Sequence, residues 1–309
     1  MASPPASTKV VHDFFPIFRV YEDGRVERFQ NHVSVPPTDN PETGVQSKDV
    51  VIVPENNVWA RLYLPKVTDG AEKFPVLFYI HGGAFSIESA SSATYDKYLH
   101  AVTAKANVVT VSVEYRLAPE HKLPACYDDS WAAMQWVASH GNDGGQGSDP
   151  WLKIHADLSR VFLAGDSAGA NIAHYMMVKA SEEKSRDCLK PVGMILGHPY
   201  FGISGEPDKL WEFVYPDCPA SGDPMGNPAA IPGLLSQLGC SKILVCIAEK
   251  DFIRDRGLKY YEALKNSGWG GQLELVDSDG EEHVFHLLNP TCEQADLMMN
   301  RVVSFLKSA

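Results

Sequence analysis

The chain has 309 residues, a formal net charge of −12 and a hydrophobic content of 44%. This acidic balance disfavours the phosphate backbone of nucleic acids, which is bound by clustered lysine and arginine. The sequence also lacks an apolar run near the roughly 20 residues that span a bilayer. We therefore expect neither a nucleic-acid partner nor a membrane span.

The cysteines and the first residues bear on where the protein works. The six cysteines are widely spaced, and none falls in a Cys-x-x-Cys pair. In a chain of this size, that spacing favours reduced thiols over a disulfide framework. Residues 1–9 lack the basic and then apolar pattern of a secretory signal. These features together predict a cytosolic location.

The first half of the chain changes from paired strands to an alternation of strands and helices. Residues 1–16 are predicted to be mobile, and Asp23-Gly24 between two alternating runs is typical of a hairpin. Strand, helix, strand, helix then indicates a parallel sheet with helices on both faces. The predicted strands are 17–21, 25–29, 50–53, 58–64, 75–80 and 108–113, and the predicted helices are 94–106 and 124–140.

The second half continues the alternation around one interruption. Residues 199–240 are rich in proline and glycine but carry too many aromatic side chains for a solvated linker. We interpret them as an insertion that forms a cap over the strand ends together with residues 1–45, within one domain of residues 1–309. The remaining predicted strands start at 160, 192, 242 and 272, and the remaining helices cover 172–178, 254–267 and 291–307.

A Gly-x-Ser-x-Gly motif lies between the strand that starts at residue 160 and the helix that follows it. The serine is Ser167, flanked by Gly165 and Gly169. A sharp turn between a strand and a helix exposes such a serine above the sheet edge and strains its backbone. Glycines are needed there because a side chain would collide with neighbouring backbone. The motif predicts a nucleophile elbow.

A second motif follows the strand at 75–80. His81-Gly82-Gly83-Ala84 places two glycines where backbone N–H groups can face a reacting carbonyl. Acyl transfer requires such donors for the oxyanion that forms in the transition state. We predict that the amides of Gly82, Gly83 and Ala168 form this oxyanion hole.

An acid and a histidine are expected after the serine, in that order. Asp251 lies at the tip of the loop after the strand at 242–248, whereas Glu249 adjoins the strand and Asp255 falls in the next helix. His283 lies nearer to its strand end than His286 does. We therefore predict Asp251 and His283 as the partners of Ser167, with Glu249, Asp255 and His286 as alternatives.

The sequence indicates no metal or nucleotide site. His283 and His286 are three residues apart, but a third ligand is not evident and the His-Glu-x-x-His pattern is missing. Neither a Gly-x-Gly-x-x-Gly motif after a strand nor a phosphate-binding P-loop is present. We predict a reaction without a cofactor.

The joint set of motifs resembles plant carboxylesterases of the hormone-sensitive-lipase-like group of α/β-hydrolases, which also includes 2-hydroxyisoflavanone dehydratases and the gibberellin receptor. The resemblance covers nearly the whole chain. It rests on His81-Gly82-Gly83, residues 115–121, residues 165–171, Asp251 and His283-Val284-Phe285. It implies an α/β-hydrolase fold with a mostly parallel sheet, the triad Ser167, Asp251 and His283, and the oxyanion hole named above.

The resemblance implies hydrolysis of small or medium carboxylic esters through an acyl-enzyme. The same family also implies two alternatives, a dehydratase or alkaloid cyclase that uses the same site, and a hormone receptor without catalysis. Ala84 stands where many members have a third glycine, and its methyl is expected to narrow the acyl side. The expected partner is a small ester or specialised metabolite, bound by a monomer or weak homodimer. Pocket candidates are Ala84, Phe85, Ile87, Trp211, Phe213, Tyr215 and Phe285.

Overall fold

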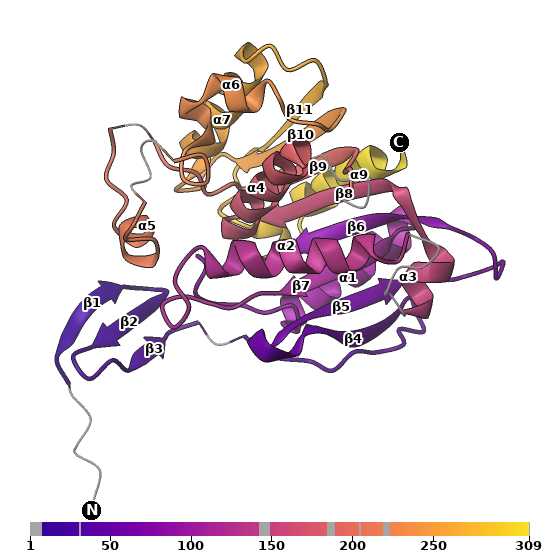
Figure 1. Ribbon diagram of the computed structural model, residues 1–309, viewed down its shortest axis with the longest axis horizontal. Coiled ribbons are helices and arrows are strands. Elements are labelled where there is room, and N and C mark those ends of the chain that lie inside the picture. The colour runs from indigo at the N-terminus through magenta and orange to yellow at the C-terminus, as the bar shows by residue number, and fades with distance from the viewer. Residues whose placement is uncertain are drawn as a thin grey trace, which may run out of the picture.

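An eight-stranded sheet forms the centre of the computed structural model, which describes residues 8–30, 32–141, 149–183, 189–203, 205–218 and 223–308 (Figure 1). The strand order is β11-β10-β9-β8-β6-β7-β5-β4. The strands from β11 to β7 run parallel to one another, and the pairs β5–β7 and β4–β5 are antiparallel. The strands are β4 (Gln46–Val53), β5 (Val58–Leu64), β6 (Phe74–Ile80), β7 (Val109–Glu114), β8 (Ala156–Asp166), β9 (Gly193–Gly197), β10 (Lys242–Ala248) and β11 (Gln272–Ser278).

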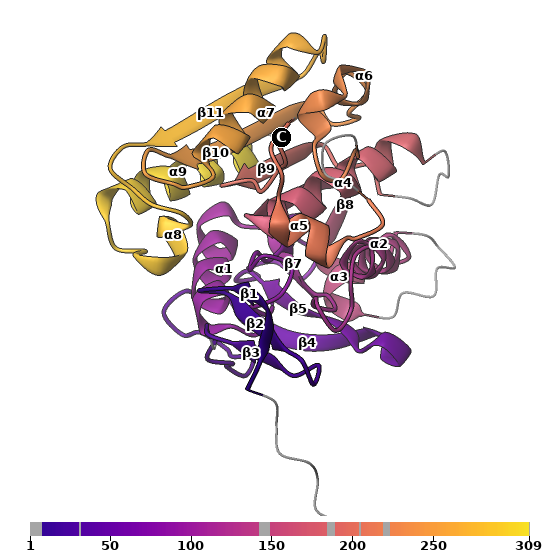
Figure 2. The ribbon, with the colours of Figure 1, turned by 90° about the vertical axis from the view of Figure 1, so that its left-hand side faces the viewer.

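Helices cover both faces of this sheet, and Figure 2 shows α1 and α8 on one side and α2 and α4 on the other. The first face carries α1 (Ala93–Ala106), α8 (Phe285–Leu288) and α9 (Glu293–Lys307), and the second carries α2 (Ala125–Ala138), α4 (Ala168–Glu182) and α7 (Arg254–Asn266). The shorter helices are α3 (Pro150–His155), α5 (Lys209–Val214) and α6 (Pro232–Leu235), with 3-10 turns η1 (Pro54–Asn56) and η2 (Pro228–Ala230). Among the described residues, none of the helices is long and apolar enough to cross a membrane.

The apolar run of β6 explains why both faces need helices. Successive side chains of a strand point to opposite faces. Phe78 and Ile80 accordingly belong to the core beneath α2 and α4, and Leu77 and Tyr79 belong to the core beneath α1 and α9. A strand that is buried on both sides is typical of a parallel sheet in an α/β protein. The predicted fold class is confirmed.

A separate three-stranded antiparallel sheet precedes the large one. It consists of β1 (Val10–Phe14), β2 (Phe18–Tyr21) and β3 (Val26–Arg28). The prediction that residues 1–16 are mobile is wrong for residues 10–14, which pair with β2; residues 1–7 lie outside the described residues. Phe213 of α5 packs against the rings of His12 and Phe14, at 4.5 and 5.0 Å between ring centroids. The N-terminal sheet therefore contacts the 199–240 segment.

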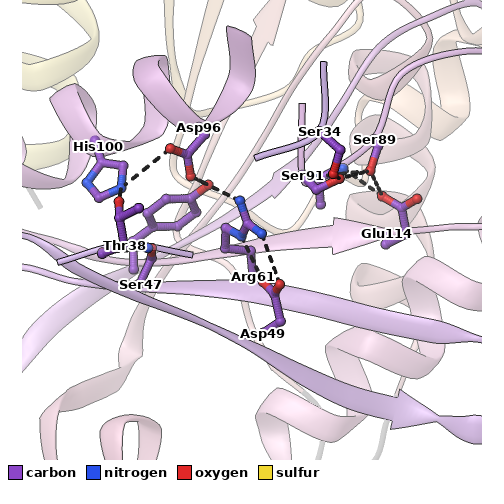
Figure 3. Close-up of polar contacts among 12 residues, drawn as sticks. Ser34, Thr38, Ser47, Asp49, Arg61, Ser89, Ser91, Asp96, His100 and Glu114 are labelled. Carbon is purple, nitrogen blue, oxygen red and sulfur yellow. Dashed lines mark hydrogen bonds and ion pairs between the residues drawn. The ribbon is translucent and has the colours of Figure 1, made fainter. Parts of the chain in front are cut away.

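A buried arginine joins β4, β5 and α1 (Figure 3). Arg61 of β5 is 1% exposed, and its guanidinium donates to both carboxylate oxygens of Asp49 at 2.7 and 2.9 Å. The same guanidinium donates to Oδ1 of Asp96 on α1 at 3.2 Å. Nε2 of His100, one turn further along α1, lies 3.7 Å from Oδ2 of Asp96. The two aspartates balance the charge of the buried guanidinium, and their contacts anchor α1 to the antiparallel edge of the sheet.

Candidate active site

Ser167 lies in a strained turn between β8 and α4. Its φ of 52° and ψ of −119° fall in a region that non-glycine residues rarely adopt. A Cβ on Gly165 would come within 2.4 Å of the backbone of Gly169, and one on Gly169 within 2.1 Å of the carbonyl oxygen of Ile80. Both glycines of the motif are therefore required by close backbone approach. The turn has the conformation of the predicted nucleophile elbow.

The structure brings Ser167, His283 and Asp251 together from the ends of β8, β11 and β10, on one edge of the sheet. Nε2 of His283 is 3.0 Å from Oγ of Ser167, and Nδ1 of His283 is 2.9 Å from Oδ2 of Asp251. The amide of Ile253 donates to Oδ1 of Asp251 at 2.9 Å. Ser167 is 8% exposed, so the residue is largely shielded from solvent. A serine hydroxyl, an imidazole and a carboxylate in this order can transfer a proton away from the serine.

The alternative acids and the alternative histidine lie elsewhere. Oε2 of Glu249 accepts a hydrogen bond from the amide of Gly280, and Asp255 belongs to the first turn of α7. His286 is buried in α8, where its ring stacks on His198 at 5.4 Å and meets Tyr98 edge-on. The geometry therefore assembles the preferred residues and not the alternatives.

Asp251 is nearly inaccessible, and its side chain is 1% exposed. Burial acts to raise the pKa of Asp251, but hydrogen bonds from His198 and His283 outweigh burial and hold this pKa below its ordinary value. The carboxyl group is therefore ionised throughout the neutral range. An ionised carboxylate beside His283 can hold the orientation of that imidazole through Nδ1.

The loop after β6 supplies backbone donors, although not the pair that the sequence predicts. The amide of Gly82 donates to the hydroxyl of Tyr95 at 2.9 Å and is therefore not free to bind a substrate oxygen. Within the described part of the chain, the amides of Gly83, Ala84 and Ala168 have no acceptor. Gly83, Ala84 and Phe85 have φ values of 98°, 54° and 60°. This left-handed run turns the amides after Gly82 away from the regular sheet.

Asp166 ties this loop to the elbow. Its Oδ1 accepts from the hydroxyl of Tyr79 and its Oδ2 from the hydroxyl of Tyr95, both at 2.8 Å. Burial raises the pKa of Asp166 to about 6, although the two tyrosine hydrogen bonds act to lower it. A Cβ on Gly82 would come within 2.4 Å of Oδ2 of Asp166, so the first glycine of the loop makes room for this carboxylate.

A family model described as alpha/beta hydrolase fold matches residues 77–287. The chain belongs to this family. It is 45% identical to a 2-hydroxyisoflavanone dehydratase of Glycyrrhiza echinata, over 98% of each chain. It is 43% identical to probable carboxylesterase 13 of Arabidopsis thaliana, over 97% of this chain and 98% of the relative. The predicted relationship to plant carboxylesterases and hydroxyisoflavanone dehydratases is confirmed.

A solved structure of an esterase from Pyrobaculum calidifontis is also similar to this α/β-hydrolase. The two chains are 28% identical and superpose with a TM-score of 0.69 over 85% of this chain and 84% of the other. This likeness supports the fold assignment independently of the plant relatives.

Most of the predicted pocket residues of this α/β-hydrolase are parts of the core. Phe85, Ile87, Trp211 and Phe285 are each at most 5% exposed. The Phe85 ring meets the Trp211 ring edge-on at 6.0 Å, so the loop after β6 packs directly against α5. Phe213, Tyr215 and Ala84 are partly exposed. The roles of all seven residues in substrate binding stay predictions.

Two residues near the triad were not singled out in the sequence. Phe252 follows Asp251, is 81% exposed and holds its ring 4.9 Å from that of His283. His198 follows β9, is buried and hydrogen-bonds Asp251. The available signal was position, since His198 comes directly after β9 and Phe252 lies in the loop after β10, on the edge that carries Ser167.

The triad acid and two histidines also form the one cluster among the described residues with metal-ligand spacing. Nδ1 of His198, an oxygen of Asp251 and Nδ1 of His283 lie within 4.8 Å of one another. Both nitrogens, however, hydrogen-bond the carboxylate, and a ring nitrogen that carries a proton cannot also bind a metal. The hydrogen-bonded arrangement fits proton transfer better than metal binding.

Proposed function

We propose that this α/β-hydrolase is a serine carboxylesterase that cleaves small to medium carboxylic esters through an acyl-enzyme. The proposal rests on the contact of Nε2 of His283 with Oγ of Ser167 at 3.0 Å, backed by the ionised Asp251. The esterase names of the plant and archaeal relatives support the same reaction class. Neither a metal nor an organic cofactor takes part in the proposed chemistry.

The first half-reaction forms the acyl-enzyme. Oγ of Ser167 attacks the ester carbonyl carbon while its proton moves to Nε2 of His283, and the carbonyl oxygen becomes an anion. The amides of Gly83, Ala84 and Ala168 would hold this anion, since the amide of Gly82 is taken by Tyr95. The imidazolium then gives its proton to the leaving alcohol oxygen as the carbon–oxygen bond breaks.

The second half-reaction restores the enzyme. Water gives a proton to Nε2 of His283 and attacks the acyl carbon, and the bond to Oγ of Ser167 breaks as the proton returns to that oxygen. Asp251 orients His283 and stabilises its positive charge twice in each cycle. The same three residues therefore serve both half-reactions.

Rapid-mixing kinetics with p-nitrophenyl esters of increasing acyl length would test this proposal. We expect a burst of one p-nitrophenol per active site whenever deacylation is slower than acylation, and we expect Ser167→Ala to lose both burst and turnover by a factor of about 10⁵ or more. Turnover of the best ester that survives unchanged in Ser167→Ala would refute it. A folded wild-type protein that turns over no ester in the series would refute it as well.

A second candidate function is elimination of water from a 2-hydroxyisoflavanone, since a dehydratase for that substrate is 45% identical to this chain. His283 would then act as the base and the oxyanion donors would hold the substrate carbonyl. Comparing kcat/KM for p-nitrophenyl esters with that for a 2-hydroxyisoflavanone separates the two reactions. A third candidate, a hormone receptor, would bind its ligand without turning over either substrate.

A further inference from the structure

His198 lies at the first position after β9 in a backbone conformation that few non-glycine residues adopt. Its φ is 46°, in the left-handed region, and its side chain is buried. The amide of His198 donates to the carbonyl of Cys246 on β10 at 2.7 Å, which fixes the residue between two strands. Backbone strain that neighbouring contacts maintain is typical of functional sites.

The segment around His198 also holds the nucleophile. The amide of Ser167 donates to the carbonyl of Gly197 at 2.8 Å, and the amide of Tyr200 donates to the carbonyl of Ser167 at 3.1 Å. Residues on both sides of His198 therefore bind the backbone of the elbow. The placement of the His198 ring is coupled to the placement of Ser167.

The buried His198 ring hydrogen-bonds Asp251. Its Nδ1 is 2.8 Å from Oδ2 of Asp251, the same oxygen that meets Nδ1 of His283 at 2.9 Å. With the amide of Ile253 on Oδ1, three donors fix the Asp251 carboxylate at both of its oxygens. His283 is 19% exposed at its side chain, whereas the side chain of His198 is fully buried.

The proton of the His198 ring can be placed from its surroundings. Asp251 is ionised and can only accept, so Nδ1 of His198 carries a proton. Nε2 of His198 has no partner among the described residues. Burial lowers the pKa of His198 although Asp251 acts to raise it, and burial also lowers the pKa of His286, which stacks on it. The titratable groups that face this ring are Asp251, His283 and His286, and the ring is a neutral donor.

We propose that His198 is a positioning residue that fixes the Asp251 carboxylate and limits how much of its negative charge acts on His283. The inference rests on the proposed function, because it concerns the same proton transfer. A neutral N–H that shares Oδ2 withdraws part of the charge that would otherwise stabilise the His283 imidazolium. Loss of this donor frees the carboxylate to rotate and leaves more negative charge beside His283.

Two substitutions at position 198 separate the donor from the ring. His198→Asn keeps an N–H near the place of Nδ1, and asparagine tolerates a positive φ better than most residues. His198→Gly removes the donor and also fits the left-handed backbone. His174→Leu is the control, since His174 is a buried histidine whose ring nitrogens have no partner in the described ranges.

The measurement is the pH dependence of kcat and kcat/KM for a p-nitrophenyl ester, with thermal unfolding to confirm that each variant is folded. We expect His198→Gly to lose kcat by about 10- to 100-fold, the range for a hydrogen bond to a charged group, with little change in KM. The fall of kcat/KM on the acid side of its pH profile should move to higher pH in this variant. The kcat of His198→Asn should stay within about threefold of wild type, with no shift of the acid side of its profile. His174→Leu should match wild type in both kcat and the pH profile.

Equal losses in His198→Gly and His198→Asn, with no shift of the acid side of either profile, would show that the ring only fills space, and would overturn the inference. Wild-type kcat in His198→Gly would overturn it too. If His198→Gly does not fold, His198→Leu provides the same contrast, because leucine has the branching of asparagine without its donor. A wild-type protein without esterase turnover refutes the proposed function itself, whereas an active wild type with an unaffected His198→Gly refutes only this inference.

Discussion

Two carboxylates that face histidines in this chain differ in what else binds them. Asp96 gives one oxygen to the guanidinium of Arg61 at 3.2 Å, and its other oxygen lies 3.7 Å from His100 (Figure 3). Asp251 accepts N–H groups from His198 and His283, and among the described residues no arginine or lysine binds it. A guanidinium that Asp96 shares with Asp49 partly offsets the charge of the first carboxylate, whereas the second faces only imidazole and amide donors.

The two histidines also differ at the ring nitrogen that does not face the carboxylate. Nε2 of His283 lies 3.0 Å from the hydroxyl of Ser167, whereas Nδ1 of His100 has no partner in the described part of the chain. Nε2 of His100 faces both Asp96 and the hydroxyl of Thr38, at 3.7 and 3.5 Å, so one nitrogen meets both groups. His283 uses a different nitrogen for each partner, and its ring therefore connects the charge of Asp251 to the hydroxyl of Ser167. The comparison teaches that an acid next to a histidine is a site only where a third group and an uncompensated charge complete it.

Replacing each acid by its amide gives the largest expected contrast. Asp251→Asn should lower kcat by about 10⁴, because an amide cannot hold the His283 tautomer or stabilise its charge. Asp96→Asn should leave kcat within about threefold. Ester hydrolysis at pH 7.5 by both purified variants checks this. Comparable losses of kcat in the two variants would remove the distinction between the two pairs.

Removing the guanidinium of Arg61 should lower the stability of the fold and leave catalysis unchanged. Arg61→Met leaves Asp49 and Asp96 without their buried partner and should lower the free energy of unfolding by about 3 kcal/mol. Denaturant unfolding measures this loss. Active-site titration gives the concentration of working sites, by which the maximal rate is divided to obtain kcat. We expect that kcat to equal wild type, and a fall of tenfold or more would mean that the Arg61 cluster also serves the site.

His174 extends the comparison to a histidine with no acid at all. Burial lowers the pKa of His174 to about 3. The unfolded chain takes up this proton below about pH 6.5 and the folded chain does not, so stability is present above that pH and is lost as pH falls toward 3. His174→Leu should therefore gain about 1.4 kcal/mol over wild type for each pH unit below 6.5. Unfolding at pH 7.5, 6 and 5 measures this, and a difference that does not change with pH would contradict it.

Ala84 should give the smallest effect. Ala84→Gly keeps the amide that we assign to the oxyanion hole and relieves a residue at φ 54°. We expect kcat/KM for acetate esters to change by less than about threefold, with the preference moving toward longer acyl chains because the methyl is gone. A series of p-nitrophenyl esters checks this. A loss of 10-fold or more for every ester would mean that the methyl itself supports the loop.

The fold and the approach of Ser167, His283 and Asp251 to one another could be predicted because both follow from chain order. Alternating strands and helices specify a parallel sheet, and parallel strands end at one edge, so Ser167, Asp251 and His283 had to converge there. The bounds of β10 agree with the prediction, and those of β6 and α1 differ from it by one residue. Close backbone approach at Gly165 and Gly169 likewise follows from the motif itself.

The missed features depend on contacts between distant residues. The amide of Gly82 donates to the hydroxyl of Tyr95, which lies on α1. The local glycine pattern carries no information about that tyrosine. β1 forms because β2 offers it an edge, although most of its residues stay exposed to solvent. His198 follows a strand without any motif around it, and only the folded chain shows that it faces Asp251.

The central claim is that Ser167 is a nucleophile made reactive by His283 and Asp251. Its most direct test is fluorophosphonate labelling of the wild-type protein, read by intact mass and peptide mapping, with Ser167→Ala and Asp96→Asn alongside. We predict one adduct on Ser167 in the wild type and in Asp96→Asn, and none in Ser167→Ala. A folded wild-type protein that stays unlabelled, or an adduct on another residue, would contradict the account.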